Sequence, residues 1–489
     1  MALRARLVAP PPVADKTWQW HVVKSASIPA SALLLGDRRM EAETYLSSGY
    51  GLRIAIESKS KGWVPFHQLA KVEQPGRLKG ILVSPEYGQP FLAATQVFDV
   101  RPIPRKFLAV EKMDGAKACY VEDGTILVTR SGSVGRATIA HSVHRGIVVS
   151  DDLLRVKPVD SRNMGWIYAY LHAPQTRAMT KGAQYGHIIK HLEVSHLDAL
   201  PIPTVSDGVA ADFTKRVGRI LDLRNEGHRL TLEAESRFEK ALGSIAVKDW
   251  GEAGFSVRAS KTFFSGRKRL DASVHNPGVA AIRRHLAKHG KGFTSLAEAG
   301  YDIWVPGRYK RIPAEDGVVY RDSADLLEVS PDLTKRFADC RFGDDFRGRV
   351  KSGWILIPCS GQVYGIIGTA TLATDALDDQ VVSNHVVRAA PRKGSAPVGY
   401  VLTVLAHPVF GRPVVKALAF GSSVPELDPD DLAALKLVRL QTREESAIAE
   451  LAEASANARA AADVLEREIT IDAGTILDTF IAGMPAHTS

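Results

Sequence analysis

The spacing of apolar positions predicts short strands in the first part of the chain. Between residues 15 and 205, runs rich in Val, Ile and Thr are bounded by Gly and Pro, which is the pattern of strands separated by turns. Such runs occur at 78–83, 91–98, 125–129 and 146–156. Two stretches with helical spacing follow, at 166–178 and 191–200. The second ends at Pro201-Ile202-Pro203, which cannot continue a helix and therefore predicts a domain boundary.

Residues 209–242 then predict one long helix. This stretch has no proline, and apolar or small side chains recur at near-heptad spacing: Phe213, Val217, Ile220, Gly227, Ala234, Phe238 and Ala241. We expect Asp207 to cap this helix and Gly243 to stop it. At about 1.5 Å per residue, the helix is roughly 50 Å long. Because a glycine costs about 1 kcal/mol against alanine in a helix, Gly227 predicts the close approach of a second helix.

The strand-like pattern returns between residues 244 and 440. Its β-rich runs lie at 317–320, 354–358 and 381–388, and residues 399–406 predict a helix that matches residues 165–172. A second long helix, rich in Ala and Glu, follows from Thr442 with apolar residues at heptad-like spacing: Ile448, Leu451, Ala458, Ala462, Leu465 and Ile469. Each β-rich stretch is thus followed by one long helix.

Short sequence landmarks occur twice and in the same order. The first landmark, Arg39-Met40-Glu41-Ala42, returns as Arg269-Leu270-Asp271-Ala272, and the second, Pro75-Gly76-Arg77-Leu78-Lys79, returns as Pro306-Gly307-Arg308-Tyr309-Lys310. The third, Ile126-Leu127-Val128 followed by Ser131-Gly132, returns as Ile355-Leu356-Ile357 followed by Ser360-Gly361. The fourth, Gly186, Leu192, Leu197 and Leu200, returns as Gly421, Leu427, Leu432 and Leu435. The shift is about 230 positions each time, far too long for a solenoid. We interpret the pattern as a tandem duplication that supplies two copies of one binding surface.

The pattern predicts an α+β fold with a duplicated architecture. Two β-rich globular domains with short helices, at 15–205 and 244–440, are separated by helices at 206–243 and 441–483. We expect the two helices to pack antiparallel and to hold the globular domains apart at opposite ends.

The charge of the chain is concentrated on the predicted globular domains. The net charge is +9, whereas residues 207–243 hold equal numbers of acidic and basic side chains and residues 441–489 hold an excess of acidic ones. The excess positive charge therefore lies on the repeated domains. Such a surface suits a polyanion such as DNA or RNA, whose phosphates give sequence-independent affinity. A basic surface that only confers solubility is the alternative.

Composition indicates a soluble, cytoplasmic protein. No run of about 18 apolar residues is present, and the first residues lack the apolar core of a signal peptide. Cys119, Cys340 and Cys359 are odd in number and have no CxxC spacing, which fits a reducing compartment and argues against structural zinc. The pair His285 and His289 shares a helix face without the glutamate of a zinc protease motif, so we predict no metal site.

Several polar and basic positions are candidates for DNA contact. The turn Thr129–Arg136 carries Arg130, Ser131 and Arg136 beside glycines, and a basic approach to the last short helix carries Lys181, Gln184, Tyr185, His187 and Lys190. The duplicated positions Arg77, Lys79, Arg308 and Lys310, together with Arg311, are expected to contact phosphates. Arg and Lys suit guanine, and Gln suits adenine, in the major groove. A tight hairpin around the glycines and an ordinary solvated loop are the alternative interpretations.

Motifs for catalysis are missing from the sequence. The chain has no GxxxxGK[ST] nucleotide loop and no Asn/Asp-Pro-Pro-Tyr/Phe motif of amino-methyltransferases, since Asn276-Pro277-Gly278 does not match it. We therefore predict a non-catalytic chain. A stand-alone nuclease with a divergent site, built on an acidic cluster such as Asp378 and Asp379, is a less favoured alternative.

The ordered set of landmarks resembles the specificity subunit of type I restriction–modification systems. The resemblance covers almost the whole chain and is carried by the two Arg-Met/Leu-acid-Ala openings, by Ile126–Gly135, and above all by the run from Gly186 to Pro203. It implies two target-recognition domains that each read one half of a split DNA site, with the helices as spacer and docking surface. The second copy departs from the pattern: Tyr364 replaces the glycine at Gly135, and Leu435-Lys436-Leu437-Val438 lacks the Pro-Ile-Pro ending.

The same resemblance implies partners and cofactors. We expect two DNA methyltransferase subunits and, in some systems, a restriction subunit, with S-adenosylmethionine, ATP and Mg²⁺ bound by those partners and not by this chain. The expected partner-binding residues are Phe213, Val217, Ile220, Phe238, Leu451 and Leu465, and Tyr364 joins the expected DNA contacts. Such a system serves phage defence through DNA methylation. A two-domain DNA-binding scaffold of another defence complex is the remaining alternative.

Overall fold

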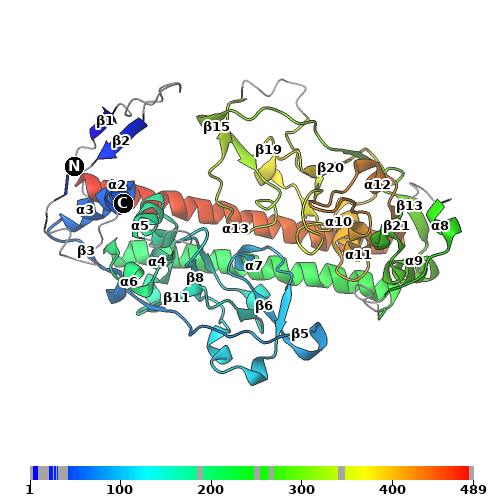
Figure 1. Cartoon of the computed structure of the whole chain (residues 1–489), viewed down its shortest axis with the longest axis horizontal. Helices are drawn as coiled ribbons and strands as arrows, with labels where there is room; N and C mark the ends of the chain where they lie inside the picture. The colour runs from blue at the N-terminus through cyan, green and yellow to red at the C-terminus, as the bar shows by residue number, and fades with distance from the viewer. Residues whose placement is uncertain are drawn as a thin grey trace, which may run out of the picture. The chain divides into compact units, whose positions relative to one another are not determined.

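A computed structural model describes residues 4–8, 21–25, 27, 28, 30, 42–183, 191–246, 254–263, 269–339 and 347–483. These residues form a mixed α and β structure, in agreement with the predicted α+β class (Figure 1). They divide into two compact units. Unit 1 comprises the chain up to Val97, Pro102–Leu221 and the chain from Leu465 onward, and unit 2 comprises Phe98–Arg101 and Asp222–Val464.

Unit 1 is built on a central antiparallel sheet with the order β4-β11-β8-β9. Its strands are β4 (Ala70–Glu73), β11 (Leu153–Pro158), β8 (Ile126–Thr129) and β9 (Ala137–Ile139). All four residues of β8 are buried, as the apolar run at 125–129 predicts. Two further antiparallel pairs join β1 (Arg4–Val8) to β2 (His21–Ser25) and β3 (Trp63–Pro65) to β12 (Pro201–Pro203).

A second sheet of unit 1 has the order β10-β6-β7-β5, and we name it, with the loops that join its strands, lobe 1. Its strands are β10 (Val148–Val149), β6 (Gln89–Leu92), β7 (Lys106–Leu108) and β5 (Leu82–Val83). β10 runs parallel to β6, and the other neighbours are antiparallel. The predicted run 146–156 is therefore divided between two sheets, and most of the predicted run 91–98 is not a strand.

The short helices of unit 1 are α2 (Ala42–Leu46), α3 (Ser48–Glu57), α4 (Met164–His172), α5 (Pro174–Ala183) and α6 (Val194–Asp198). The prediction of one helix at 166–178 is wrong, because Pro174 has no N–H to continue α4 and instead begins α5. The prediction of a helix at 191–200 is too long. After α6, Pro201 and Pro203 lie in β12, a two-stranded edge where a missing N–H is tolerated.

Unit 2 has a central antiparallel sheet with the order β14-β20-β17-β18. Its strands are β14 (Tyr301–Trp304), β20 (Val386–Pro391), β17 (Ile355–Pro358) and β18 (Thr371–Leu372). β15 (Pro313–Arg321), β16 (Arg336–Phe337) and β19 (Val381–Val382) form a smaller sheet that we name, with its loops, lobe 2. β13 (Gly292–Ser295) pairs with β21 (Lys436–Arg439).

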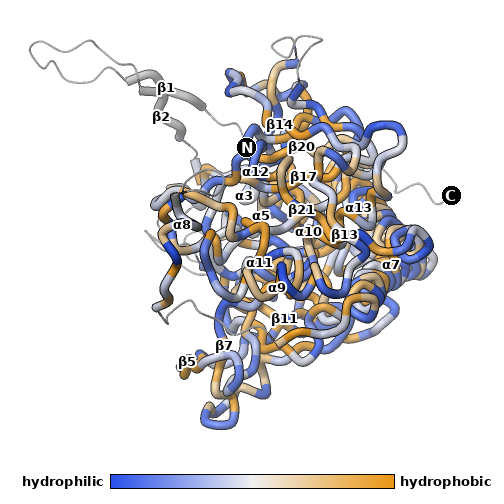
Figure 2. The backbone as a smooth tube through the Cα atoms, turned by 90° about the vertical axis from the view of Figure 1, so that its right-hand side faces the viewer, coloured by the Kyte–Doolittle hydropathy of each residue, from blue (hydrophilic) through white to orange (hydrophobic). Residues whose placement is uncertain are grey.

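The helices of unit 2 cover an apolar core. They are α8 (Ala259–Phe263), α9 (Pro277–His289), α10 (Val398–Ala406), α11 (Arg412–Lys416) and α12 (Pro429–Ala433). The helix predicted at 399–406 is confirmed as α10. Its Tyr400 and Val401 are buried with Ile355 and Ile357 of β17, and Figure 2 shows hydrophobic segments gathered around these elements.

Each central sheet encloses a buried arginine that binds backbone carbonyls. In unit 1, Arg155 is 5 % exposed, and its guanidinium donates to the oxygens of Leu153, Cys119 and Val149 at 3.3–3.5 Å. In unit 2, Arg388 is 0 % exposed and donates to the oxygens of Ser383, Val386, Gly348 and Val382. Burial lowers the pKa of Arg388 to about 10, so the side chain stays charged at neutral pH.

Two long helices, α7 (Asp207–Leu242) and α13 (Thr442–Ala482), contribute to both units. In unit 2 they run antiparallel, because Arg237 pairs with Glu444 while the hydroxyl of Ser455 donates to the oxygen of Gly227 at 2.6 Å. A Cβ on Gly227 would lie 2.9 Å from Arg459 Cγ, so the predicted close approach of a helix at this glycine is confirmed. In unit 1, Arg216 of α7 pairs with Asp472 of α13 at 2.5 Å.

The ends and the register of these helices differ in detail from the prediction. α7 begins at Asp207, and the hydroxyl of Ser206 accepts the N–H of Val209 at 3.4 Å, so Asp207 is not the cap. Gly243 has a φ of 76° and stops the helix as predicted. Ala241 is exposed and Leu242 is buried in its place.

Candidate nucleic-acid interface

In lobe 1, Arg77 and Lys79 project from either side of an anchored leucine. Leu78 packs against the lobe core of Leu108, Cys119 and Val148, and its N–H donates to the Asp151 carboxylate at 3.3 Å. Arg77 and Lys79 are exposed. Because alternate residues of an extended chain face opposite sides, an inward leucine leaves its basic neighbours free to meet a polyanion.

In lobe 2, Arg308 and Lys310 flank an anchored tyrosine in the same way. Tyr309 packs against a cluster that includes Tyr320 and Val381, and its hydroxyl donates to the oxygen of Val382 at 3.3 Å. Burial raises the pKa of Tyr309, which therefore stays neutral. Arg308 and Lys310 are exposed.

Arg311 follows this segment and is exposed as a residue, but its side chain is engaged. Its guanidinium donates to the Tyr320 hydroxyl at 2.8 Å and lies 5.3 Å from the centre of the same ring. A guanidinium held in this way has a fixed direction.

The glycines of the turn Thr129–Arg136 serve the backbone of a hairpin between β8 and β9. Gly132 and Gly135 have φ values of 68° and 75°, a region that other residues rarely adopt. The N–H of Gly135 donates to the oxygen of Thr129 at 2.9 Å, and a Cβ on Gly135 would lie 2.3 Å from the hydroxyl of Thr180. The tight-hairpin interpretation therefore holds for the glycines.

Arg130 and Ser131 are engaged inside unit 1. The Arg130 guanidinium pairs with Asp152 at 3.5 Å and with Glu193 at 2.5 Å, and Ser131 donates to the same Asp152 carboxylate. Arg130 is thus paired with two carboxylates inside unit 1, and its contact with DNA stays a prediction. Arg136 is half-buried, and Lys181 is exposed near the end of α5. Four other candidates, Gln184, Tyr185, His187 and Lys190, lie outside the described residues.

The corresponding turn of unit 2 carries apolar side chains. The N–H of Gly361 donates to the oxygen of Pro425 at 3.1 Å, and the amide of Gln362 donates to the oxygen of Ser423 at 3.0 Å, so two turns are joined. They expose Tyr364 at 63 %, Phe420 at 40 % and Val424 at 57 %. Sequence reasoning named Tyr364 alone, since Phe420 and Val424 fit no motif.

Ser360, next to Gly361 in this pair of turns, contacts two polar side chains. Its hydroxyl lies 2.9 Å from His385 Nδ1 and 3.5 Å from a carboxylate oxygen of Glu426. The serine is therefore fixed between two polar partners, as Ser131 is held by Asp152 in unit 1.

The residues predicted to bind a partner are largely inside the chain. Phe213, Val217, Ile220 and Phe238 are each at most 1 % exposed. The Phe213 ring contacts Trp166 at 5.4 Å between centroids, so these surfaces are already covered. The partner-binding prediction is therefore wrong for these four side chains. Leu451 and Leu465 are half-buried.

Other apolar side chains of the long helices are exposed and were not predicted. Leu232 of α7 is 50 % exposed, and Val464 and Ile471 of α13 are 38 % and 66 % exposed. They lie off the heptad stripe, which is why a search for buried periodicity passes over them.

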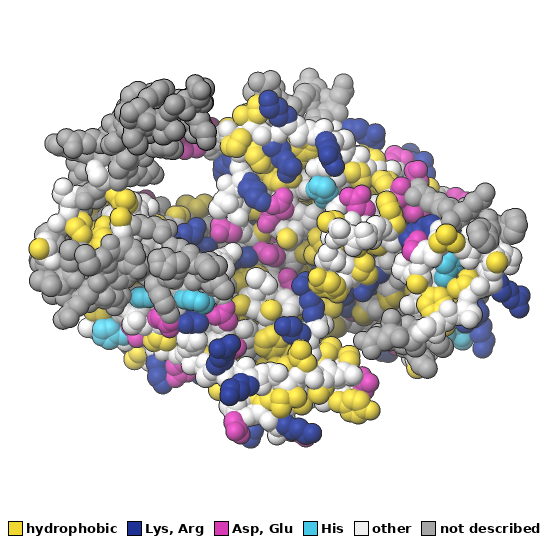
Figure 3. All heavy atoms as spheres, viewed as in Figure 1, with side chains coloured by type: hydrophobic (Ala, Val, Ile, Leu, Met, Phe, Trp, Pro, Cys, Tyr) yellow, Lys and Arg dark blue, Asp and Glu magenta, His cyan; other side chains and the backbone are white. Residues whose placement is uncertain are grey.

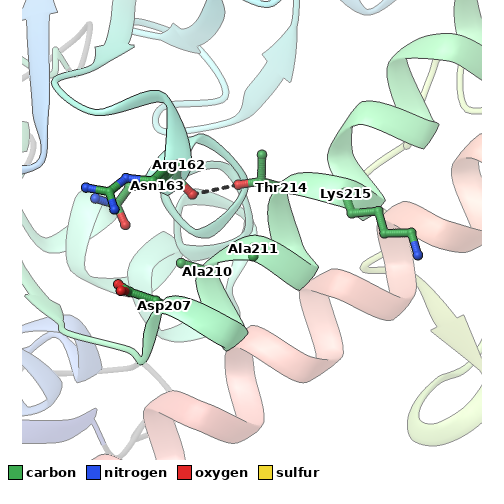
Figure 4. Close-up of a pocket in the computed structure, with 7 residues that line it drawn as sticks. All are labelled: Arg162, Asn163, Asp207, Ala210, Ala211, Thr214 and Lys215. Carbon is green, nitrogen blue, oxygen red and sulfur yellow. Dashed lines mark hydrogen bonds between the residues drawn. The ribbon is translucent and has the colours of Figure 1, made fainter.

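A hollow near the start of α7 is lined by charges of both signs (Figure 4). Its lining residues are Arg162, Asn163, Asp207, Ala210, Ala211, Thr214 and Lys215. The Thr214 hydroxyl donates to the oxygen of Arg162 at 2.8 Å, and the Arg162 side chain pairs with Asp160 at 2.6 Å. Since the arginine is already paired, we assign no ligand to this hollow.

Acidic and histidine clusters have structural partners. Asp378 and Asp379 both lie within salt-bridge distance of Lys351, at 3.8 and 3.2 Å. His285 stacks on Phe410 at 5.6 Å between ring centroids. Within the described residues, no group of three or more His, Cys, Asp or Glu side chains is placed to hold a metal ion. Among these same residues, no helix has the length and apolar character needed to cross a membrane.

Comparisons with known proteins find likeness among solved structures. No family model and no curated protein matches the chain. It is similar to the type I restriction–modification system S subunit from M. genitalium, with 14 % identity, a TM-score of 0.34, and coverage of 88 % of this chain and 98 % of that one. It is also similar to the HsdS subunit from Thermoanaerobacter tengcongensis, with 12 % identity, a TM-score of 0.26, and coverage of 87 % and 97 %.

A further similarity reaches the type IIG restriction endonuclease BpuSI, with 14 % identity and a TM-score of 0.26 over 40 % of this chain and 30 % of that one. The resemblance to type I specificity subunits that the sequence landmarks indicate is thus also found among solved structures, over most of the chain. Because every TM-score is below 0.5, the proposals that follow rest on the residues of this chain.

Proposed function

We propose that this chain is the sequence-specificity subunit of a type I restriction–modification complex. Units 1 and 2 supply two target-recognition domains that each read one half of a bipartite DNA site. The chain itself performs no catalysis, and it directs methyltransferase subunits, and in some systems a restriction subunit, to the site. S-adenosylmethionine, ATP and Mg²⁺ belong to those partners.

The observation that carries this proposal is the matched placement of basic side chains in the two lobes. In Arg77-Leu78-Lys79 and in Arg308-Tyr309-Lys310, the partly buried middle residue packs against a lobe core and the basic neighbours are exposed. In lobe 1 the adjoining parallel pair is Phe91 beside Val148, and in lobe 2 it is Tyr320 beside Val381. Two equal phosphate-contacting positions suit a protein that binds two half-sites.

A contact that recurs at matching positions of the two units is the second support. In unit 1, Trp166 donates through its ring nitrogen to the oxygen of Pro203 at 2.9 Å. In unit 2, Tyr400 occupies the matching helix position and donates to the oxygen of Val438 at 2.6 Å. We infer that one ancestral domain was copied, and that its recognition role was copied with it.

We propose that the methyltransferase subunits dock on the exposed faces of the long helices. Leu232, Val464 and Ile471 are apolar, exposed and on regular helix, which suits packing against partner helices. This assignment replaces the four buried residues of the sequence-based prediction.

Methylation sequencing of genomic DNA, with and without the gene for this chain, tests the function. We expect a split motif with a fixed gap to lose methylation when the gene is deleted. Methylation that is unchanged by the deletion would contradict the proposal. Re-expression of the chain in the deletion strain is the control and should restore the same motif.

A further inference from the structure

Lobe 1 carries three exposed apolar side chains on its outer strand and the turn that follows. Ile81, Leu82 and Tyr87 are 45 %, 60 % and 77 % exposed. In the view of Figure 3, hydrophobic and basic side chains lie next to one another on the part of unit 1 around β5 and β6. Exposed apolar residues at such density mark a contact surface more often than a solvated one.

The segment that carries these side chains is held firmly on the lobe. Leu82 pairs with Leu108 of β7, and the N–H of Ala109 donates to the oxygen of Ile81 at 3.0 Å. The turn Pro85–Tyr87 closes through the N–H of Tyr87, which donates to the oxygen of Ser84 at 3.0 Å. The exposed side chains therefore sit on an ordered protrusion.

The glycine that ends this turn explains why the turn is tight. A Cβ on Gly88 would lie 2.5 Å from Val83 Cγ2 and 3.0 Å from Phe107 Cβ, so the backbone presses against its neighbours. A turn held this rigidly can keep its conformation when it packs against another molecule.

The charges around the protrusion favour a polyanion as the occupant. Arg77 and Lys79 precede it in the chain, and Lys106 of β7 is exposed on the strand that pairs with β5. Glu86, in the turn itself, is the opposing carboxylate. Basic residues that flank an apolar tip are the arrangement by which proteins enter a groove of duplex DNA and open a base step.

We propose that Leu82 and Tyr87 form an apolar wedge that enters a groove of the DNA and partly unstacks one base step, while Arg77 and Lys79 contact the adjoining phosphates. This inference rests on the proposed function and deepens it. Among the described residues of lobe 2, no large apolar side chain is comparably exposed. We therefore assign the wedge to the half-site that unit 1 reads, and we expect that half-site to require an easily opened step.

Selection from a pool of random-sequence duplexes of about 40 base pairs tests the wedge, because flexible TA and CA/TG steps are the easiest to open. The probes are the full-length chain, the double variant Leu82→Ala/Tyr87→Ala, and Val159→Ala as a matched control, since Val159 is an exposed apolar residue of unit 1 outside lobe 1. We expect the wild type and the control to enrich a split motif with a flexible step at a fixed place beside one half. The double variant should keep the base preferences of both halves, lose the flexible step, and bind the selected DNA about ten-fold more weakly.

The outcomes separate the wedge from the function on which it rests. If the wild type enriches no motif, the specificity function fails and the wedge fails with it. If the wild type and the double variant enrich the same motif with the same flexible step, the wedge alone is overturned. A double variant that selects DNA normally but no longer co-purifies with a methyltransferase would also overturn it, since the surface would then be a protein-docking site.

Discussion

Unit 1 and unit 2 share a backbone arrangement, which we call the frame: a central antiparallel sheet that encloses a buried arginine. They differ in the side chains that the turns of this frame carry. In unit 1 the segment that closes the domain is tied to the central strand by the N–H of Leu192, which donates to the oxygen of Arg130 at 2.9 Å. In unit 2 the N–H of Leu427 donates to the oxygen of Cys359 at 2.8 Å. The backbone bond recurs, while an arginine in one unit stands where the other has a cysteine.

The buried arginines of the two units also make matching contacts with the backbone. Arg155 donates to the oxygens of Leu153 and Val149, and Arg388 donates to those of Val386 and Val382 at the matching places. Arg388 adds a fourth bond, to the oxygen of Ser383. Contacts made to backbone survive changes of side chain, so they keep the frame constant while the sequences of the two units diverge.

The turns above the frame differ in chemistry. Unit 1 presents a charged network around Arg130, and unit 2 presents Tyr364, Phe420 and Val424 beside the pair of Ser360 and His385. Under the proposed function, two half-sites that meet such different surfaces need not share a sequence, because direct readout depends on the side chains offered. The comparison shows that the side chains of these turns differ between the units while the backbone contacts of the frame stay the same.

The largest expected effect comes from removing the buried arginine of unit 2. Arg388→Met removes four hydrogen bonds to backbone oxygens, and we expect it to destabilise the chain by about 3–5 kcal/mol. The oxygens of Val382 and Gly348 keep a second donor, the Tyr309 hydroxyl and the N–H of Val382. Arg155→Met removes longer bonds and should destabilise by about 1–3 kcal/mol. Urea unfolding gives the free energies, and hydrogen exchange at β17 and β8 assigns each loss to its unit.

The control for this pair is Arg392→Met, because Arg392 is exposed, its pair with Asp302 spans 3.6 Å, and it donates to one backbone oxygen, that of Ala297 at 2.8 Å. Its substitution should change stability by well under about 1 kcal/mol. Equal losses for the two buried arginines would break the comparison, since they would show that the fourth bond and the shorter distances in unit 2 contribute nothing.

A pH-dependent difference between the units is expected at the end of α10. His407 follows this helix, whereas Ala173 follows α4 at the matching place. Burial lowers the pKa of His407 from 6.5 to about 4, and its Nδ1 accepts the N–H groups of Val409 and Phe410 at 3.3 and 3.2 Å. The unfolded chain binds the proton first, so stability is complete above pH 6.5 and is lost as pH falls toward 4.

We expect unit 2 to lose about 2 kcal/mol between pH 7 and pH 5 through this histidine. His407→Asn keeps an acceptor for the two N–H groups and should remove that slope, whereas the exposed His289→Asn should leave it intact. The measurement is urea unfolding at each pH. An unchanged slope in His407→Asn would assign the acid sensitivity to other groups.

The periodicity of apolar residues predicts the strands and helices of the frame, because these elements bury the apolar side chains. The run Ile126-Leu127-Val128 was predicted as a strand, and all its residues are buried. In α13 the same reasoning is confirmed at Ile448, Ala462 and Ile469, which are buried, whereas Leu451 and Leu465 are half-buried. Its seam includes Glu445 and Glu466, at 2 % and 0 % exposure, and apolar spacing cannot count a buried acid.

The buried acids have one partner near in the chain and one far from it. Glu445 pairs with Arg439 at 2.6 Å, and Glu466 accepts the hydroxyl of Tyr168, nearly three hundred positions away in the chain. Arg130 is a predicted DNA contact because it flanks a turn of Gly and Ser. Its partners Asp152 and Glu193 come from other elements of unit 1, so only the fold shows that its charge is already used.

The exposed basic pairs of the two lobes test whether both lobes contribute equally to DNA binding. Arg77→Gln/Lys79→Gln and Arg308→Gln/Lys310→Gln should each weaken DNA binding about ten-fold, with a loss of about 2 in the slope of log affinity against log salt. Titration of the full chain with duplex DNA at several salt concentrations measures both quantities. Lys240→Gln, at an exposed lysine of α7, is the control and should keep the slope. If one lobe pair changes the slope and the other does not, the lobes are not equivalent binding surfaces.

The smallest expected effect compares two glycines of α7. A Cβ on Gly218 meets nothing within 4 Å, so Gly218→Ala should stabilise the chain by about 0.8 kcal/mol through helix propensity. At Gly227 a Cβ would lie 3.2 Å from the oxygen of Ser455 and 2.9 Å from Arg459 Cγ, so Gly227→Ala should offset that gain and lower stability. Urea midpoints decide the sign of each. A stabilising Gly227→Ala would mean that α13 can move away from α7, and the close approach would then not be what requires glycine at this position.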